Sequence, residues 1–286
     1  MSNFIVKKVA VLGAGVMGAQ IAAHCINARV PVVLFDLPAK EGPKNGIVQR
    51  AIENLKKLSP APLGNKDDAA LIQVANYEDD LAVLEGCDLI IEAVFESRDL
   101  KAKVTQEAEP QLAPGGFFAS NTSTLPIGGL ATASGRPEKF VGIHFFSPVD
   151  KMKLVEIVRG LATSDETVQR TIELAERMGK TPIPANDRAG FVSNRVLMPL
   201  INEAFFAWME GVAEPEAIDE IMKLGCNFPM GPLRLADFIG LDVCHDIMMV
   251  LYRELGDQKF FPCPLLRQLV TAGRLGDKSG HGVYEH

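Results

Sequence analysis

A glycine motif near the start of the chain joins a strand pattern to a helix pattern. Residues 9–12 are apolar and β-branched, as in a buried strand, and residues 18–25 carry small and apolar side chains at helical spacing. Between them the glycines follow the order Gly-x-Gly-x-x-Gly, at Gly13, Gly15 and Gly18. Glycine lets the backbone turn tightly and approach a ligand closely, and a helix N-terminus favours an anion such as a pyrophosphate. The stretch predicts a strand–turn–helix unit that binds a dinucleotide.

Glycines also mark ordinary turns, so the prediction depends on the residues beyond the helix. A second apolar run, residues 30–36, ends in Asp36, 18 positions after Gly18. A carboxylate at the end of the second strand binds the ribose hydroxyls of NAD and repels the 2′-phosphate of NADP. A turn or helix-cap role is the alternative for Asp36, because Leu37 and Pro38 follow it. The spacing favours the cofactor role, and it favours NAD over NADP.

Strand and helix patterns alternate as far as residue 187. Strand patterns recur at 87–94, 115–123, 139–147, 154–160 and 180–187, and helix patterns at 45–58, 99–112 and 164–179. Such alternation predicts an α/β fold, a doubly wound and mostly parallel sheet of Rossmann type with helices on both faces.

Only helix patterns follow from about residue 188. The helix expected over 189–211 is apolar on nearly all sides, which predicts that it is buried. We therefore expect an NAD-binding domain over 1–187 and an all-helical substrate and dimerisation domain over 188–286. A homodimer is expected because long apolar helices offer more apolar surface than one small domain covers. The alternative is that the helices bury these faces on each other.

Composition excludes several classes of partner. Over 286 residues the formal charge is −7, with no dense Lys/Arg cluster, which argues against nucleic-acid binding. No apolar run approaches the ~20 residues of a membrane span, and the first strand begins too early to leave room for a signal peptide. Five cysteines without a C-x-x-C pair suit reduced thiols. We expect a cytoplasmic protein with no membrane partner, no disulfide and no metal.

A run of polar side chains follows the strand pattern at 115–123. Ligands of open α/β sheets bind beyond the carboxyl ends of the strands, so Asn121, Thr122 and Ser123 are expected to face the cofactor. The alternative is a turn that caps the next helix, which is the more ordinary role for Thr122 and Thr124.

A histidine and a glutamate occupy the next two strand patterns. His144 is suited to move a proton at neutral pH, and a carboxylate such as Glu156 fixes the ring tautomer and stabilises the imidazolium. Beside two phenylalanines, however, His144 also fits a packed core position. Glu156 also fits the outward face of an alternating strand, and the spacing does not force the two side chains to pair.

Six segments in their order along the chain resemble the L-3-hydroxyacyl-CoA dehydrogenase family in its stand-alone form. They are VLGAGVMGAQIA, IIEAVFESRDLKAKV, ASNTSTLPI, GIHFFSPVDKMKLVEIV, FVSNRVLMPLINEA and LGDKSGHGVY. The resemblance covers essentially the whole chain. It implies the reversible oxidation of an L-3-hydroxyacyl-CoA to the 3-ketoacyl-CoA, with hydride transfer to NAD.

The resemblance also implies residue roles. His144 matches the catalytic histidine and Glu156 its carboxylate partner. Ser123 matches a serine near nicotinamide and substrate, and Asn194 an asparagine near the substrate carbonyl. The positions expected to bind the cofactor are Gly13, Gly15, Met17, Gly18, Asp36, Val94, Phe95, Glu96, Lys101 and Ser123. Those expected to bind the acyl-CoA are Ser123, Ser147, Asn194 and, with weaker support, Lys56 and Lys57 near the CoA phosphates.

Ser147 departs from the family pattern, because many stand-alone members read H-F-F-N-P where this chain reads H-F-F-S-P. Two other functions stay open. One is an NAD-dependent dehydrogenase of a free 3-hydroxy acid or sugar acid, which would need no CoA thioester. The other is a nonenzymatic NAD-binding protein, which a turnover assay would distinguish.

Overall fold

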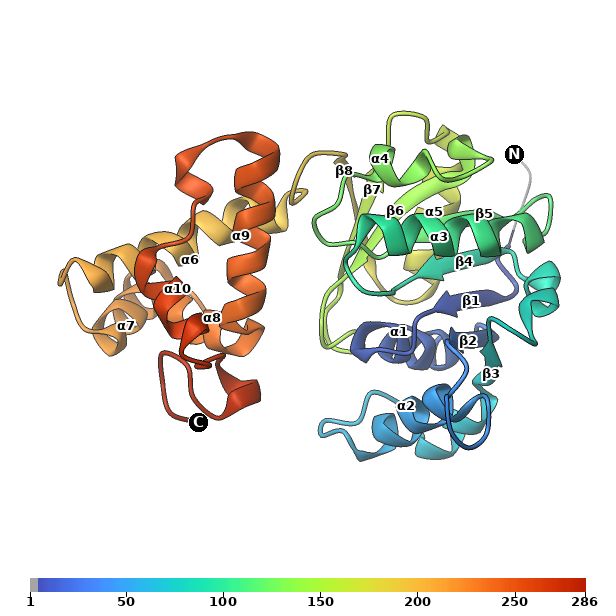
Figure 1. Ribbon diagram of the computed structural model, residues 1–286, viewed down its shortest axis with the longest axis horizontal. Coiled ribbons are helices and arrows are strands. Elements are labelled where there is room, and N and C mark those ends of the chain that lie inside the picture. The colour runs from blue at the N-terminus through green and yellow to red at the C-terminus, as the bar shows by residue number, and fades with distance from the viewer. Residues whose placement is uncertain (1–4) are drawn as a thin grey trace. The chain divides into compact units, whose positions relative to one another are not determined.

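The computed structural model describes residues 5–286 and divides the chain into two units, the first ending at Asp187 and the second running from Arg188 to His286 (Figure 1). Among its described residues, the first unit contains one sheet of eight strands. In chain order they are β1 (Val9–Leu12), β2 (Val32–Asp36), β3 (Gln73–Asn76), β4 (Leu89–Glu92), β5 (Phe117–Ser120), β6 (Phe140–Phe145), β7 (Leu154–Arg159) and β8 (Thr181–Asn186).

The sheet is mostly parallel. Its order is β3-β2-β1-β4-β5-β6-β7-β8, in which β1 to β6 run parallel and β7 pairs antiparallel with β6. The last strand, β8, runs parallel to β7. The order 3-2-1-4-5-6 of the first six strands is that of the doubly wound dinucleotide-binding fold, with its reversal at β1 and β4. The predicted fold class is confirmed.

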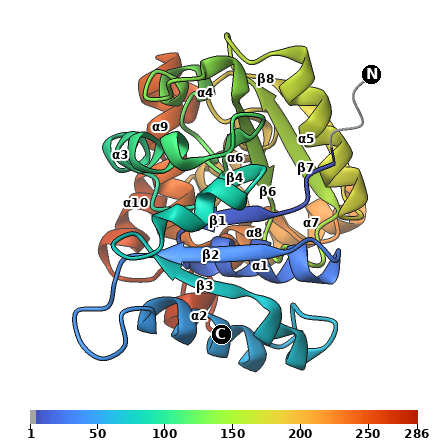
Figure 2. The ribbon, with the colours of Figure 1, turned by 90° about the vertical axis from the view of Figure 1, so that its right-hand side faces the viewer.

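Helices cover both faces of this sheet. They are α1 (Val16–Asn27), α2 (Gly46–Lys57), α3 (Arg98–Ala108), α4 (Ile127–Ala131) and α5 (Asp165–Arg177). Figure 2 shows α1 and α5 on one face and α3 and α4 on the other. The start of α5 follows the expected pattern, because the Ser164 hydroxyl accepts a hydrogen bond from the amide of Thr167 and two acidic residues occupy the first turn.

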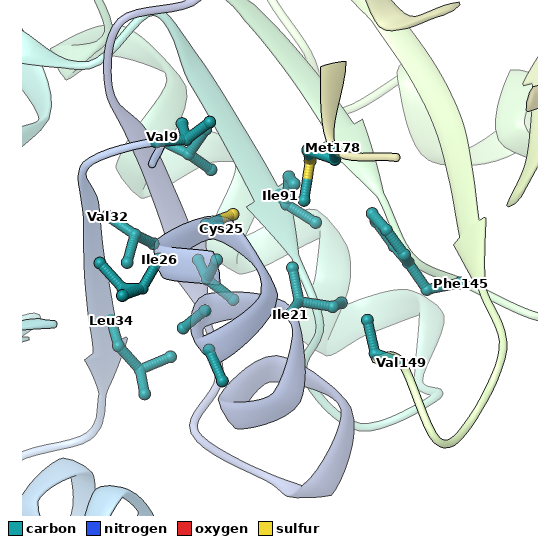
Figure 3. Close-up of a cluster of buried hydrophobic side chains, with 14 of the residues drawn as sticks. Val9, Ile21, Cys25, Ile26, Val32, Leu34, Ile91, Phe145, Val149 and Met178 are labelled. Carbon is teal, nitrogen blue, oxygen red and sulfur yellow. The ribbon is translucent and has the colours of Figure 1, made fainter. Parts of the chain in front are cut away.

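The core of the first unit packs α1 onto the sheet. Ile21 and Cys25 of α1 lie in one buried cluster with Leu34 of β2, and Phe145 at the end of β6 belongs to it too (Figure 3). Burying a side chain of this size contributes about 1.5–3 kcal/mol. Successive strand residues point to opposite faces, so burial of Phe145 sends the preceding residue, His144, to the other face.

The second unit is helical. Its helices are α6 (Ser193–Met209), α7 (Pro215–Cys226), α8 (Pro232–Ile239), α9 (Leu241–Leu255) and α10 (Pro264–Thr271). The first of them was expected to be buried because it is apolar on nearly all sides, and the structure buries only part of it. α6 buries Ile201 and Phe205, whereas Val196 is 67% exposed and Met209 is 42% exposed. Apolar composition alone therefore overestimates its burial. Within residues 5–286, no helix combines the length and the apolarity that crossing a membrane requires.

Two buried aspartates attach the C-terminal tail to this helical unit. The carboxylate of Asp237 accepts hydrogen bonds from the amides of Val283 and Tyr284 at 2.8 and 2.9 Å, and it lies 2.8 Å from Nε2 of His286. Asp219 accepts a bond from the Tyr284 hydroxyl at 2.8 Å. These bonds fix the tail without a strand of its own.

Candidate active site

The polar residues singled out in the first unit gather at the carboxyl edge of the sheet. The glycine turn follows β1, Asp36 ends β2, Glu96 lies beyond β4, Ser123 lies beyond β5, and His144 is near the end of β6. Because these strands are parallel, their carboxyl ends meet at one edge, where ligands of such sheets bind.

Two positions of the glycine turn have no room for a side chain. Gly13 has a φ of 103°, and a Cβ there would lie 2.7 Å from the carbonyl oxygen of Ala93. A Cβ on Gly18 would lie 1.8 Å from the carbonyl oxygen of Gly13, so only glycine lets α1 start this close to the turn. A Cβ on Gly15, by contrast, would meet no described atom within 4 Å. The turn thus packs tightly against the protein at Gly13 and Gly18, and it leaves space beside Gly15.

Asp36 borders a cavity and also braces the glycine turn. Its Oδ2 accepts a hydrogen bond from the amide of Ala14 at 2.6 Å, and its Oδ1 accepts one from the amide of Leu37 at 2.7 Å. The cavity has a volume of about 310 Å³. It is lined by Gly13, Gly15, Val16, Met17, Asp36, Leu37, Tyr77, Ala93, Val94, Phe95, Leu100 and Val104.

These features fit NAD. The N-terminus of α1 carries no side-chain cap, so its amide groups remain available for a pyrophosphate, and the open space at Gly15 allows close approach. The carboxylate of Asp36 fits a ribose with a 2′-hydroxyl. Apolar side chains around it fit the faces of an adenine ring, and one of them, Phe95, is 87% exposed.

A buried ion-pair network lies behind the cavity. Lys101 is 2% exposed, and its ammonium group lies 2.8 Å from Oε1 of Glu92 and 3.3 Å from Oε2 of Glu96. Glu92 also accepts bonds from the Ser120 hydroxyl at 2.6 Å and the Val94 amide at 2.7 Å. Lys101 is therefore the counter-ion of two carboxylates and does not line the cavity. Sequence reasoning missed Glu92, although an acid inside the apolar run LIIEAV was a visible signal.

Glu96 holds the loop that carries Ser123. Its Oε1 accepts hydrogen bonds from the Thr122 and Thr124 hydroxyls at 2.6 and 3.0 Å, and from the amides of Ser123 and Thr124 at 3.0 Å. Burial raises the pKa of Glu96, but the charge of Lys101 and these hydrogen bonds outweigh it, so the pKa lies below the ordinary value. Glu96 stays ionised at neutral pH and fixes the backbone at Ser123.

His144 and Glu156 meet across an antiparallel strand pair. The register places them directly opposite each other on β6 and β7, and Nδ1 of His144 lies 2.7 Å from Oε2 of Glu156. Both residues are buried, at 7% and 3% exposed, and the Phe146 ring lies against the imidazole with 4.6 Å between centroids. The amide of the next strand residue, Phe145, donates to the side chain of Asn121 at 2.9 Å. This bond ties the end of β6 to the loop after β5.

The loop between β6 and β7 is anchored by residues that the sequence did not single out. Lys180 donates from its ammonium group to the carbonyl oxygens of Val149 and Met152. Gln20 of α1 accepts a bond from the Val149 amide at 2.8 Å. Ser147 is exposed at the start of this loop. A lysine beside a strand gave no sequence signal of this role.

The remaining predicted residues belong to other elements. Asn194 is in the first turn of α6, in the helical unit. Lys56 and Lys57 end α2, where Lys56 lies 2.7 Å from Glu53 in an exposed ion pair.

A doubly wound sheet whose glycine turn and Asp36 fit NAD, with a buried histidine–carboxylate pair at the same sheet edge, defines an NAD-dependent oxidoreductase as the class of protein. The comparisons with known proteins narrow that class. A family model described as "3-hydroxyacyl-CoA dehydrogenase, NAD binding domain" matches residues 8–188, and one described as "3-hydroxyacyl-CoA dehydrogenase, C-terminal domain" matches residues 190–286.

Proteins named 3-hydroxybutyryl-CoA dehydrogenase are similar to this chain over nearly the full length of both chains. A "Probable 3-hydroxybutyryl-CoA dehydrogenase" of Deinococcus radiodurans is 48% identical over 283 residues, which cover 98% of this chain and 100% of that protein. A "3-hydroxybutyryl-CoA dehydrogenase" of Bradyrhizobium diazoefficiens is 44% identical over 287 residues, covering 99% and 96%. The crystal structure of an (S)-3-hydroxybutyryl-CoA dehydrogenase from Ralstonia eutropha is similar with a TM-score of 0.87 and 41% identity, covering 99% of each chain.

This chain belongs to the 3-hydroxyacyl-CoA dehydrogenase family and uses NAD. The predicted family and cofactor are confirmed.

Proposed function

We propose that this chain interconverts L-3-hydroxyacyl-CoA and 3-ketoacyl-CoA with His144 as the general acid and base. The observation that carries the proposal is the 2.7 Å contact between Nδ1 of His144 and Oε2 of buried Glu156, at the sheet edge that also carries the cofactor cavity. Bound NAD supplies the hydride acceptor of the reaction, and NADH the donor of its reverse.

His144 transfers the proton whose movement must accompany that of the hydride. In the oxidation direction, Nε2 of His144 takes the proton from the substrate hydroxyl, and in the reduction it returns the proton to the carbonyl oxygen. Glu156 holds Nδ1 in its protonated tautomer and stabilises the imidazolium once the second proton arrives. A general acid or base of this kind contributes about 10²–10⁴ in rate.

Ser123 is proposed to contact both the nicotinamide and the substrate oxygen. The four bonds that Glu96 accepts from residues 122–124 support this role, because they fix the loop before any ligand arrives. We assign contact with the acyl thioester to Asn194 and Ser147, and contact with CoA phosphates to Lys56 and Lys57. For Lys56, the exposed ion pair with Glu53 would have to give way.

Steady-state kinetics with NADH test the reaction. Because the similar proteins are named 3-hydroxybutyryl-CoA dehydrogenases, we propose a preference for short chains, so kcat/KM should be highest for the four-carbon acetoacetyl-CoA and fall along a series of longer 3-ketoacyl-CoAs. Free acetoacetate, without the thioester, should be a poor substrate. Equal turnover of the free acid would favour a free 3-hydroxy acid dehydrogenase, and absence of turnover with every thioester would contradict the proposal.

We propose a homodimer formed through the helical unit. The support is apolar surface on and next to α7, where Val212, Ile221 and Leu224 are 73%, 62% and 78% exposed. Sedimentation equilibrium should give twice the 31.0 kDa of one chain. Ile221→Glu with Leu224→Glu should give a monomer, whereas a wild-type monomer at micromolar concentration would contradict the proposal.

We propose that the protein works in the cytoplasm. All five cysteines are free and four of them are buried, which suits a reducing compartment. Cell fractionation of a tagged full-length chain tests this, and recovery in an oxidising compartment would contradict it.

A further inference from the structure

Tyr77 lines the cofactor cavity, and its hydroxyl group has no hydrogen-bond partner among the described residues. The oxygen is buried, and no described residue bonds to it. Within residues 5–286, two other side chains, His24 and Asp242, carry buried atoms without hydrogen bonds, and neither side chain lines this cavity. A buried unpaired hydroxyl is costly, so native proteins seldom keep one.

The fold places Tyr77 beside Asp36. Tyr77 directly follows β3, whose last residue, Asn76, is in register with Asp36 on β2. Its ring packs against Phe35, with 5.9 Å between centroids. Both Tyr77 and Asp36 therefore belong to the wall that faces the adenosine half of NAD, as Asp36 does in such folds.

The turn that carries Tyr77 is rigid. Asn76 is 1% exposed, and its side-chain oxygen accepts bonds from the amides of Glu78 and Asp79 at 3.0 Å. Its side-chain amide donates to Asn45 at 2.8 Å and to Asp80 at 3.1 Å. The tyrosine is thus held in place before the cofactor binds, which lowers the entropic cost of a contact.

The hydroxyl is a donor at neutral pH. Burial raises the pKa of Tyr77, and the nearby carboxylates of Asp36, Glu92 and Glu107 raise it further. A protonated phenol gives one hydrogen bond, whereas the Asp36 carboxylate only accepts. The two side chains are complementary, since Asp36 suits the ribose hydroxyls and Tyr77 suits a ring nitrogen of adenine.

We propose that Tyr77 is a cofactor-binding residue whose hydroxyl donates a hydrogen bond to the adenine base of NAD. In the complex the hydroxyl gains the hydrogen-bond partner that it lacks in the free protein. Binding is therefore favoured both by the added contact and by the loss of a costly unpaired group. The proposal rests on NAD binding, which family membership establishes, and not on the acyl-CoA step. Its test is readable whatever the substrate is.

Tyr77→Phe removes only the hydroxyl. It should raise the stability of the free protein and lower its affinity for the cofactor. Without ligand, the variant should melt about 2–4 °C higher than wild type, because an unpaired buried hydroxyl is gone. Its Kd for NADH and for ADP-ribose, measured by calorimetry, should rise about 5- to 10-fold. The Kd for reduced nicotinamide mononucleotide, which lacks adenosine, should not change.

Tyr252→Phe is the matched control, because Tyr252 lies in the helical unit and its hydroxyl accepts a bond from Gln258. It should leave every Kd unchanged. Unchanged ADP-ribose affinity in Tyr77→Phe would overturn the proposal, as would an equal loss for the mononucleotide.

Ligand analogues test the same contact on the wild-type protein. NADH analogues in which one adenine ring nitrogen is replaced by C–H remove one acceptor at a time. One analogue should bind wild type about 5- to 10-fold more weakly and bind Tyr77→Phe no more weakly than NADH does. If every analogue binds wild type as tightly as NADH, the proposal is wrong.

Discussion

Asp36 combines two roles that a variant can separate. Its carboxylate braces the glycine turn through Ala14 and, in our account, excludes the 2′-phosphate of NADP by repulsion. We expect Asp36→Ser combined with Leu37→Arg to narrow the preference of kcat/KM for NADH over NADPH by about tenfold or more, the factor that 1.4 kcal/mol represents.

Leu37→Arg alone is the control for that variant, because it keeps the carboxylate and should keep the preference for NADH. A wild-type protein that uses NADPH as well as NADH would show that the assignment of Asp36 is wrong.

Ser147 is exposed at the start of the loop between β6 and β7. If this position only orients the ligand, Ser147→Asn should retain most of wild-type kcat with acetoacetyl-CoA. Ser123→Ala and Asn194→Ala should each lose more than tenfold in kcat/KM, because they remove proposed contacts with reacting groups. Collapse of activity in a folded Ser147→Asn protein would show that the site has been rebuilt around the serine.

The hairpin of β6 and β7 shows which part of the site the sequence could predict. His144 and Glu156 were each recognisable as proton-transfer groups, but their pairing depends on the register of two strands. A slip of one residue would send Glu156 to the opposite face of the sheet. The intervening loop is anchored by Lys180 and Gln20, through contacts that join residues 28 or more positions apart. Local patterns carry no information at that range.

Lys180 should therefore matter for the hairpin. In Lys180→Met, the carbonyl oxygens of Val149 and Met152 lose their donor. We expect the free energy of unfolding in urea to fall by about 1–3 kcal/mol, the cost of buried polar groups left unpaired. The KM for acetoacetyl-CoA should rise more than kcat falls, because the loop moves while His144 and Glu156 stay on their strands.

Lys153→Met provides the comparison, since Lys153 is an exposed lysine just before β7. It should leave both stability and KM near wild type. Equal effects of the two substitutions would mean that loss of a positive charge, and not of the anchor, is responsible.

The glycine turn and the alternation of strands and helices were predictable because each is local, written within a few residues. The network of Glu92, Lys101 and Glu96 was less so, because it joins β4, α3 and the loop after β5. Burial on α6 was overestimated, since composition does not tell which face of a helix meets a neighbour.

Stability of the whole molecule should depend on pH through His24. Burial lowers the pKa of His24 from 6.5, and the charge of Lys180 lowers it further, against smaller raising effects of its Met178 bond and of Asp150. As the pH falls, His24 is therefore protonated near pH 6.5 in the unfolded chain but only at a lower pH in the folded chain. The free energy of unfolding should be highest above pH 6.5. It should decrease as the pH falls from 6.5 through the pKa of His24 in the folded chain.

His24→Gln keeps a donor for the Met178 carbonyl and should flatten this decrease, as measured by urea unfolding between about pH 7.5 and 5. His281→Gln, at an exposed position, should leave it unchanged. The same slope in wild type and His24→Gln would exclude His24 as its source.

The central claim is that His144 and Glu156 act as one unit, and a double-mutant cycle on kcat with acetoacetyl-CoA and NADH tests it most directly. His144→Ala should lower kcat by about 10²–10⁴, and Glu156→Gln by the same or less. The double variant should be scarcely slower than His144→Ala, because residues that act as a unit are not additive. NADH affinity should be unchanged throughout, which shows that the cofactor site survives. Independent multiplication of the two losses, or near-normal kcat in His144→Ala, would contradict the account.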